Sequence, residues 1–308
     1  MRVIFMGTPD FAVGTLEAIV NKGHEVVAVF TQPDKRRGRT SELQMSPVKE
    51  TAIKYNIPVY QPHKVREPEY IRIISELKPD VIVVVAFGQI LPKELLELPP
   101  YGCVNVHASL LPKYRGAAPI QWAVIDGEEE TGVTTMKMDI GIDTGDMLMV
   151  RKYTLAPKET GGSLFDKLER LGAELLVETL DGLEAGTITP VPQTGEATHA
   201  AKLDKTIGLI DFNKSAVEIE RLIRGLNPWP SAYTSINGKT LKIWDAEVID
   251  CDCSGYKPGT IFKIDKKSIY ISTGDKALAV NELQLEGKKR METEAFLRGY
   301  TVENGTVL

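Results

Sequence analysis

The sequence predicts an α/β protein with a Rossmann-like parallel sheet in an N-terminal domain and a smaller, OB-like β-barrel in a C-terminal domain. Apolar runs alternate with helix-period segments up to residue 186, which is typical of parallel strands. After residue 206, short strands are separated by Asn-Gly, Ser-Gly, Pro-Gly and Thr-Gly turns. Residues 187–206 have no period and are rich in Pro, Gln, Thr and Gly. We therefore expect a catalytic domain at 1–186, a linker at 187–206 and a barrel at 207–308.

The chain begins with one βαβ unit. Residues 2–6 form an apolar strand, residues 11–22 repeat apolar side chains at helical spacing, and residues 25–31 form a second apolar strand. Such a unit needs a right-handed crossover, which makes its two strands parallel. The first turn reads Gly7-Thr8-Pro9-Asp10 and not Gly-x-Gly-x-x-Gly, so the phosphate-binding fingerprint of dinucleotide sites is missing.

The later elements of the first domain continue this alternation. The pattern predicts helices over 46–55, 68–77, 119–126 and 163–184. It predicts strands over 58–61, 80–87, 102–108, 132–138 and 147–155. The unbroken apolar run that ends at Phe87 indicates a central strand buried on both faces. A short helix at 215–226 precedes the strands of the second domain.

The composition excludes several classes of protein. The chain has 308 residues, 43% of them hydrophobic, and its net charge of −5 does not demand nucleic acid. The longest apolar run is about a third of a membrane span, so we expect a cytoplasmic protein. Cys103, Cys251 and Cys253 are too few for a disulfide framework, and with four scattered histidines they suggest no metal site.

Three polar residues suggest chemistry at one edge of the sheet. Asn105 and His107 are two residues apart near a strand end, so they share a face, and Asp143 follows a later strand. Ser109 lacks a Gly-x-Ser-x-Gly elbow, and no cysteine lies where His107 would activate it. Acyl transfer between two bound substrates suits this trio: Asn105 would donate to an oxyanion and Asp143 would hold His107 as an imidazolium. A histidine at a strand end is more commonly structural, and that alternative stays open.

Two loops are further candidates. Four cations follow the second strand within five residues: Lys35, Arg36, Arg37 and Arg39. They form either a solvated loop or a contact to a phosphate backbone. The turn after residue 87 is small and apolar, and it could receive a flat ring through its backbone groups or serve only in packing.

These motifs resemble the signature of the formyltransferases that use 10-formyltetrahydrofolate. The resemblance is carried by Asn105-Val106-His107-Ala108-Ser109-Leu110-Leu111-Pro112, by Tyr114-Arg115-Gly116, and by Asp139-x-Gly141-x-Asp143-Thr144-Gly145. It implies that Asn105, His107 and Asp143 are catalytic and that no metal takes part. It also implies folate binding by Ser109, Leu110, Leu111 and Pro112 and by the turn of Phe87, Gly88, Gln89 and Ile90.

Within that family the chain is most similar to the members that formylate initiator methionyl-tRNA in translation initiation. The supporting residues lie at 5–12, 116–121 and 227–232. The resemblance implies that Lys35, Arg36, Arg37 and Arg39 bind the tRNA, and we expect a monomer. Residues 206–308 carry 14 Lys+Arg against 14 Asp+Glu, so a tRNA contact there would need a local patch such as 288–290.

Three alternatives remain at this point. A formyltransferase acting on an amino-sugar nucleotide would share the trio and a following barrel, so only the acceptor site distinguishes it. The basic loop and residues 117–121 favour tRNA. A formyltetrahydrofolate hydrolase would share the trio but would not need residues 206–308. A non-catalytic RNA-binding module would not need all three polar residues.

Overall fold

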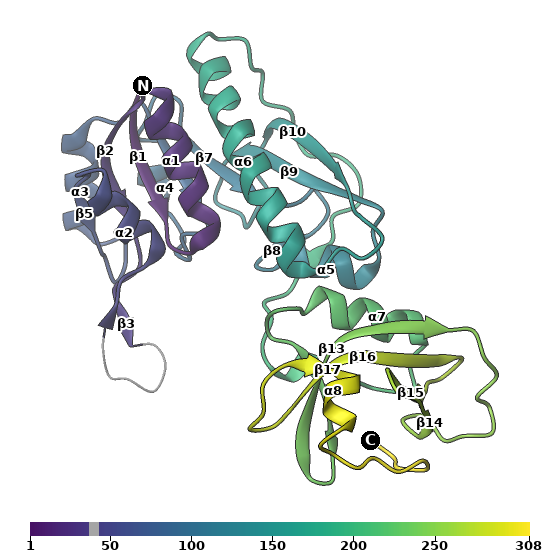
Figure 1. Ribbon diagram of the computed structural model, residues 1–308. Helices are drawn as coiled ribbons and strands as arrows, with labels where there is room; N and C mark the ends of the chain where they lie inside the picture. The colour runs from purple at the N-terminus through teal and green to yellow at the C-terminus, as the bar shows by residue number, and fades with distance from the viewer. Residues whose placement is uncertain (37–42) are drawn as a thin grey trace. The chain divides into compact units, whose positions relative to one another are not determined.

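The computed structural model describes residues 1–36 and 43–308, which form two compact units (Figure 1). The first unit comprises Met1–Gly116, Glu130–Thr154 and Phe165–Ala200, and the second comprises Ala117–Glu129, Leu155–Leu164 and Ala201–Leu308. The units thus interleave along the chain, whereas the domains predicted at 1–186 and 207–308 are continuous. Among the described residues, no helix is both long enough and apolar enough to cross a bilayer.

The first unit is built on a seven-stranded sheet in the order β10-β9-β7-β6-β1-β2-β5. Five strands are parallel: β1 (Arg2–Gly7), β2 (Glu25–Phe30), β5 (Val59–Tyr60), β6 (Val81–Val85) and β7 (Cys103–His107). The next strand, β9 (Glu130–Lys137), is antiparallel to both of its neighbours, β7 and β10 (Met147–Thr154). The parallel prediction is therefore wrong for β9 alone, because β10 runs in the same direction as the five parallel strands. The helix between β7 and β9 belongs to the second unit, so it does not provide the crossover on this sheet that a parallel β9 would need.

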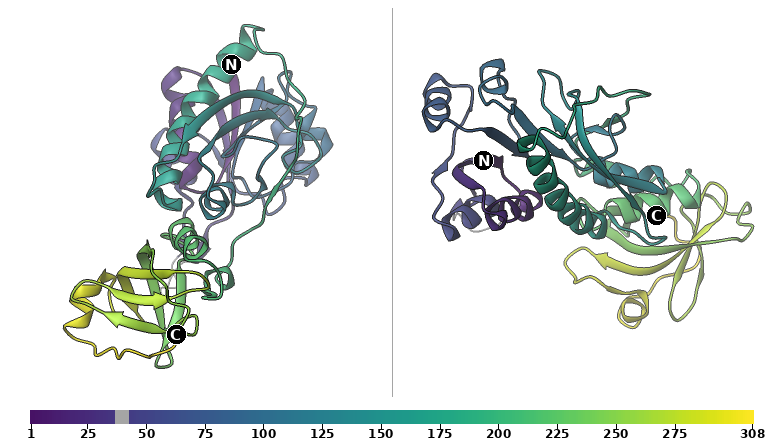
Figure 2. Two further views of the ribbon diagram at one scale, coloured as in Figure 1. Left: turned by 90° about the vertical axis from the view of Figure 1, so that its right-hand side faces the viewer. Right: turned by 90° about the horizontal axis from the view of Figure 1, so that it is seen from above.

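Helices cover both faces of this sheet, as the view from above in Figure 2 shows. They are η1 (Asp10–Ala12), α1 (Val13–Lys22), α2 (Pro47–Lys54), α3 (Pro68–Leu77), α4 (Lys93–Leu96) and α6 (Gly161–Glu184), whose first four residues belong to the second unit. One core joins the sheet to α3 and α4 through Phe30, Ile74 and Leu95. β6 is buried along its whole length, because it lies between β1 and β7 and helices cover both faces of the sheet (Figure 2). The predicted central strand is confirmed.

The chain order in the sheet reverses between β1 and β6. Open α/β sheets bind ligands outside the carboxyl ends of their strands at such a switch point. The turn that starts at Ala86 follows β6 at this edge, and the segment after His107 follows the neighbouring β7. The fold therefore brings two of the predicted site segments to the edge where a ligand is expected.

A short hairpin follows β2, formed by β3 (Lys35–Arg36) and β4 (Leu43–Gln44), and it contains two of the four predicted cations. At its base, Lys49 of α2 donates from Nζ to Asp34 Oδ2 over 2.6 Å. This hydrogen bond lowers the pKa of the Asp34 carboxyl, so Asp34 and Lys49 form an ion pair at neutral pH. The predicted residues Arg37 and Arg39 lie outside the described residues.

The second unit contains an antiparallel sheet in the order β12-β13-β16-β15-β14, with β17 beside β16. Its strands are β12 (Ala232–Ile236), β13 (Lys239–Ile249), β14 (Ile261–Ile264), β15 (Ile269–Ser272), β16 (Ala277–Leu285) and β17 (Met291–Glu292). Its helices are α5 (Pro119–Asp126), η2 (Thr206–Gly208), α7 (Ala216–Gly225) and α8 (Thr293–Leu297). Ile219 and Ile223 of α7 pack into the core of the sheet. The predicted fold class, a Rossmann-like α/β domain followed by a smaller C-terminal β domain, is confirmed, and the sheet of the second domain is antiparallel.

Candidate active site

β7 presents Asn105 and His107 on one face of the sheet. Side chains alternate along a strand, so Val106 points to the opposite face, where it meets α6 closely enough that a Cβ at Gly172 would lie 2.9 Å from Val106 Cγ1. Asn105 and His107 therefore face away from α6, roughly 7 Å apart along the strand. The register with β6 and β9 on either side fixes the backbone of Asn105.

The imidazole of His107 is buried, with 6% of the residue exposed, and each ring nitrogen has a defined neighbour. Nε2 lies 2.9 Å from the carbonyl oxygen of Tyr114, and Nδ1 lies 3.7 Å from Asp143 Oδ2. A carbonyl oxygen can only accept, so Nε2 keeps its proton in both charge states of the ring. Nδ1 is therefore the nitrogen that can gain or lose a proton, and it faces a carboxylate.

Asp143 reaches His107 by a route that strand order alone does not predict. β9 is antiparallel to β7, so Lys137 at its end lies beside Val104 and not beside His107. The loop after β9 must return along the sheet before Asp143 meets the ring. There Gly116 donates its backbone N–H to Asp143 Oδ2 over 2.8 Å, and Asp143 itself adopts a left-handed backbone with φ 54°.

The segment from Val191 to Ala200 completes this arrangement, although it lies within the predicted linker. Thr198 accepts at Oγ1 from the Tyr114 N–H over 2.8 Å, and its carbonyl accepts from the Arg115 N–H over 2.9 Å. The short strands β11 (His199–Ala200) and β8 (Arg115–Gly116) then pair in parallel. Sequence reasoning missed Thr198 and Gln193, and their polar side chains in an aperiodic stretch were the only available signal.

The hydroxyl and thiol nearest to His107 along the chain are not available as nucleophiles. Ser109 is fully buried and donates its hydroxyl to the Lys113 carbonyl over 2.7 Å. Burial raises the pKa of the Cys103 thiol to about 12, so that thiol stays protonated. By contrast, Asn105 Oδ1 is buried and has no hydrogen-bond partner in the described part of the chain. This oxygen can therefore accept a hydrogen bond from a bound group.

The residues predicted to bind folate divide into two groups. Some hold the loops together: Phe87 lies in the core, Gln89 bonds backbone groups at Pro62 and Val65, and Thr134 Oγ1 bridges the Ser109 carbonyl and the Leu111 N–H. Gly88 and Ile90 are exposed on the turn after β6, with Ile90 77% exposed. Leu110 and Pro112 are half-buried. Folate binding by these residues stays a prediction.

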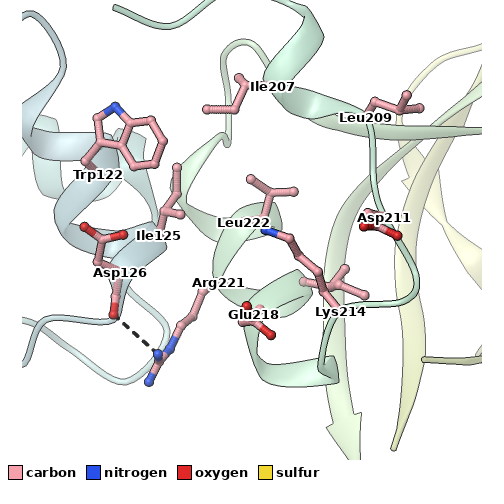
Figure 3. A pocket seen from close by; sticks show the side chains of 11 residues that line it. Trp122, Ile125, Asp126, Ile207, Leu209, Asp211, Lys214, Glu218, Arg221 and Leu222 are labelled. Carbon is pink, nitrogen blue, oxygen red and sulfur yellow. Dashed lines mark hydrogen bonds between the residues drawn. The ribbon is translucent and has the colours of Figure 1, made fainter. Parts of the chain in front are cut away.

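A hollow of about 410 Å³ lies between α5 and α7 in the second unit (Figure 3). Trp122 and Leu222 line it, and Arg221 donates to the Asp126 carbonyl at its rim over 3.4 Å. None of the predicted site residues lines this hollow. Across residues 1–36 and 43–308, no group of three or more His, Cys, Asp or Glu side chains is placed to hold a metal ion.

Comparison with known proteins decides the family. A family model described as formyl transferase matches residues 1–180, and one described as formyl transferase, C-terminal domain, matches residues 202–301. The chain belongs to the formyltransferase family. The resemblance indicated by the motifs at residues 105–116 and 139–145 is thereby confirmed.

Close relatives of this family member share its full length. A methionyl-tRNA formyltransferase from Agathobacter rectalis is 61% identical over 307 residues, covering 99% of both chains. Another with that name, from Clostridioides difficile, is 53% identical over 309 residues and covers all of both chains.

Solved structures with this fold are more distant in sequence. The sugar 3N-formyltransferase WlaRD matches with a TM-score of 0.65 at 20% identity, covering 94% of this chain and 99% of that one. HypX from Aquifex aeolicus, solved with tetrahydrofolic acid, matches with a TM-score of 0.63 at 18% identity, covering 99% of this chain and 50% of that one. These likenesses support the fold of the chain.

The Gly116 backbone gives a first prediction, because only glycine fits there. Its φ is +120°, and an added Cβ would lie 2.6 Å from the Ala200 carbonyl oxygen. We expect Gly116→Ala to cost about 1–3 kcal/mol of stability and, by displacing the N–H that holds Asp143, to lower formyl transfer about 100-fold. Thermal unfolding and steady-state kinetics measure both effects. Gly299→Ala is the matched control, because its Cβ would meet nothing within 4 Å; equal behaviour of the two variants would contradict the prediction.

Proposed function

We propose that this chain transfers the formyl group of 10-formyltetrahydrofolate to the α-amino group of methionine esterified to initiator tRNA, a step of translation initiation. The observation that carries the reaction type is the approach of His107 Nδ1 to Asp143 Oδ2 at 3.7 Å, at the end of the strand whose same face carries Asn105. The acceptor is supported by full-length relatives at 50–61% identity that are named methionyl-tRNA formyltransferase.

The chemistry assigns one task to each residue. The amine nitrogen bonds to the formyl carbon, the bond from that carbon to the folate nitrogen breaks, and a proton passes from the amine to the departing nitrogen. Asn105 donates its amide N–H to the oxygen that becomes negative in the tetrahedral intermediate. His107 exchanges the proton at Nδ1, because Nε2 stays bound to the Tyr114 carbonyl.

Asp143 stabilises the protonated form of His107 in this mechanism. The separation of 3.7 Å is within ion-pair range and longer than a direct hydrogen bond, so the carboxylate acts through its charge or through a bridging water. Both side chains are mostly buried, at 7% and 15% exposed. A site of this kind strengthens the interaction relative to water, because the local dielectric is low.

The folate is held, in this proposal, by the turn of Phe87, Gly88, Gln89 and Ile90 and by residues 109–112. The turn is anchored where Thr8 Oγ1 and Gln32 Nε2 both donate to the Phe87 carbonyl, over 3.2 and 3.1 Å. This anchoring leaves the exposed Gly88 and Ile90 to meet a flat ring at the switch point of the sheet. No step of the proposed reaction needs a metal.

A side-by-side transfer assay tests the acceptor. The purified protein is given 10-formyltetrahydrofolate with either methionyl-tRNA or an amino-sugar nucleotide, and labelled formyl product is measured. We expect product with methionyl-tRNA alone. The amino-sugar nucleotide is the alternative acceptor because structures with this fold at about 20% identity include sugar formyltransferases. Transfer to the sugar alone would overturn the proposed acceptor.

The basic loop gives a second prediction. Replacing Arg36, Arg37 and Arg39 together by alanine should weaken tRNA binding and flatten its dependence on salt, with the slope reduced by about one for each phosphate that these cations neutralise. Binding is measured by filter retention at several salt concentrations. Arg72→Ala, which removes an exposed cation from α3, is the control. If the triple variant keeps the wild-type slope, the loop is only solvated.

The proposal also covers compartment and assembly. We propose that the protein works in the cytoplasm, where aminoacylated initiator tRNA and reduced folate are both found, and that it acts as a monomer. The reducing conditions of that compartment suit the free thiols of Cys103, Cys251 and Cys253. Light scattering from the purified protein, with and without tRNA, measures the mass; a stable dimer in both samples would contradict the monomer.

A further inference from the structure

The side chain of Gln193 connects the loop that carries Asp143 to Arg115. Nε2 donates to the Asp143 carbonyl over 2.9 Å and to the Gly145 carbonyl over 2.8 Å. Oε1 accepts from Arg115 Nε over 3.1 Å and from Arg115 Nη2 over 2.7 Å. The amide orientation is unambiguous, because the two carbonyls can only accept and the guanidinium can only donate.

The backbone around Gln193 is fixed on both sides. Val191 and Met147 exchange two backbone hydrogen bonds of 2.8 and 2.9 Å, and Thr198 bonds the backbone at Tyr114 and Arg115. The side chain therefore starts from a defined position and does not need to be ordered when substrate binds. A pre-organised amide of this kind can hold another residue in place.

Asp143 needs such support because its own conformation is unfavourable. Its φ of 54° lies in the left-handed region, which costs a residue with a Cβ and persists where the surroundings over-determine it. Two clamps act on it: the Gly116 N–H holds the carboxylate, and Gln193 holds the carbonyl of the same residue. Together they fix the direction in which the carboxylate points.

We propose that Gln193 is a positioning residue for the transfer reaction, held in place by Arg115, and that it sets the Asp143 carboxylate against His107 Nδ1. This inference rests on the proposed function, since it assigns Gln193 to the same reaction. It makes the segment 191–200 part of the active site. Gln193 does not touch the reacting atoms, so its effect passes entirely through Asp143.

The Gln193→Glu variant keeps the contact with Arg115 and removes the hydrogen bonds to the Asp143 and Gly145 carbonyls. Glutamate keeps the length of the side chain and an oxygen acceptor for Arg115, but it loses both N–H donors and presents oxygen to two carbonyls. We expect kcat to fall about 100-fold while KM for folate and for the acceptor stays within about threefold, because misplacement by about 1 Å has that cost. Asn21→Asp, on the exposed surface of α1, makes the same amide-to-acid change as a control and should match wild type.

A double-mutant cycle tests whether Gln193 acts through Asp143. In an Asp143→Asn background, Gln193→Glu should lower kcat less than about threefold further, because the group it positions is already gone. A full additional 100-fold loss there would overturn the proposal, as would an unchanged kcat in the single variant. A fall in Tm of more than about 10 °C with both KM values raised would assign Gln193 to folding and also overturn it.

A readout without turnover separates this proposal from the proposed function. The ring ¹⁵N shifts of His107, with Nδ1 near Asp143 in wild type, should change in Gln193→Glu and stay unchanged in Asn21→Asp. Unchanged His107 shifts in Gln193→Glu would overturn the positioning role. If wild type formylates an amino-sugar nucleotide instead of methionyl-tRNA, the proposed acceptor fails, and the kinetic cycle is run with that sugar.

Discussion

Replacing His107 by glutamine should lower kcat for formyl transfer about 1,000-fold while the protein stays folded. Glutamine can place its amide N–H where Nε2 of the ring lies, and so it can keep the hydrogen bond to the Tyr114 carbonyl. It has no group that titrates opposite Asp143. General acid–base catalysis by a positioned side chain contributes about 10²–10⁴-fold, and this variant removes it.

The glutamine variant also distinguishes a chemical role for His107 from a structural one. A histidine that only bonds the Tyr114 carbonyl would be replaced with little loss of activity. His63→Gln, at an exposed position of the first unit, is the matched control and should behave as wild type. Single-turnover transfer, tRNA affinity and Tm are measured for both variants. Loss of tRNA affinity, or a Tm lowered by more than about 10 °C, would indicate a structural role.

The sequence allows the parallel part of the sheet to be predicted because its signals are local. β1 and β2 are apolar runs, and α1 repeats apolar side chains at helical spacing. Gly23 ends α1 at a φ of +92°, which favours glycine. The strand direction of β9 could not be predicted in the same way. It depends on where the intervening helix α5 packs, and α5 packs with α7, a helix that begins 90 residues after α5 ends.

The candidate site shows the same division between local and long-range information. Asn105 and His107 were placed together by the alternation of one strand, which is a property of neighbouring residues. The approach of Asp143 depends on contacts with Gly116 and Gln193, which lie 27 and 50 residues away. Gln193 belongs to no periodic segment and no motif, so its role becomes apparent only from its contacts with Arg115 and Asp143 in the structure.

The turn after β6 shows how long-range contacts decide what its side chains do. The sequence predicts a small, apolar turn that could receive a flat ring through its backbone groups or serve only in packing. In the structure Phe87 is only 1% exposed, and Gln89 forms hydrogen bonds with the backbone at Pro62 and Val65. These two side chains hold the turn together, while Gly88 and Ile90 are exposed. Folate binding by the four residues stays a prediction.

Asn105→Ala is expected to reduce kcat about 100- to 1,000-fold without loss of stability. Removing one donor to a developing oxyanion costs about 2.7–4 kcal/mol of transition-state stabilisation. The fold itself gains nothing from the amide oxygen, which is buried without a partner. A buried polar group left unsatisfied costs about 1–3 kcal/mol, so deleting it should leave Tm unchanged or raise it.

A variant whose kcat falls while its Tm stays the same or rises identifies a side chain that serves the reaction and not the fold. The backbone of Asn105 is paired on both sides within the sheet, so the alanine variant has no reason to rearrange. Thr134→Ala provides the contrast, because Thr134 Oγ1 bridges the Ser109 carbonyl and the Leu111 N–H and its loss should lower Tm. Calorimetry and single-turnover transfer on both variants measure the two quantities. If Asn105→Ala lowered Tm as Thr134→Ala does, with activity following stability, Asn105 would be a structural residue and the oxyanion would need another donor.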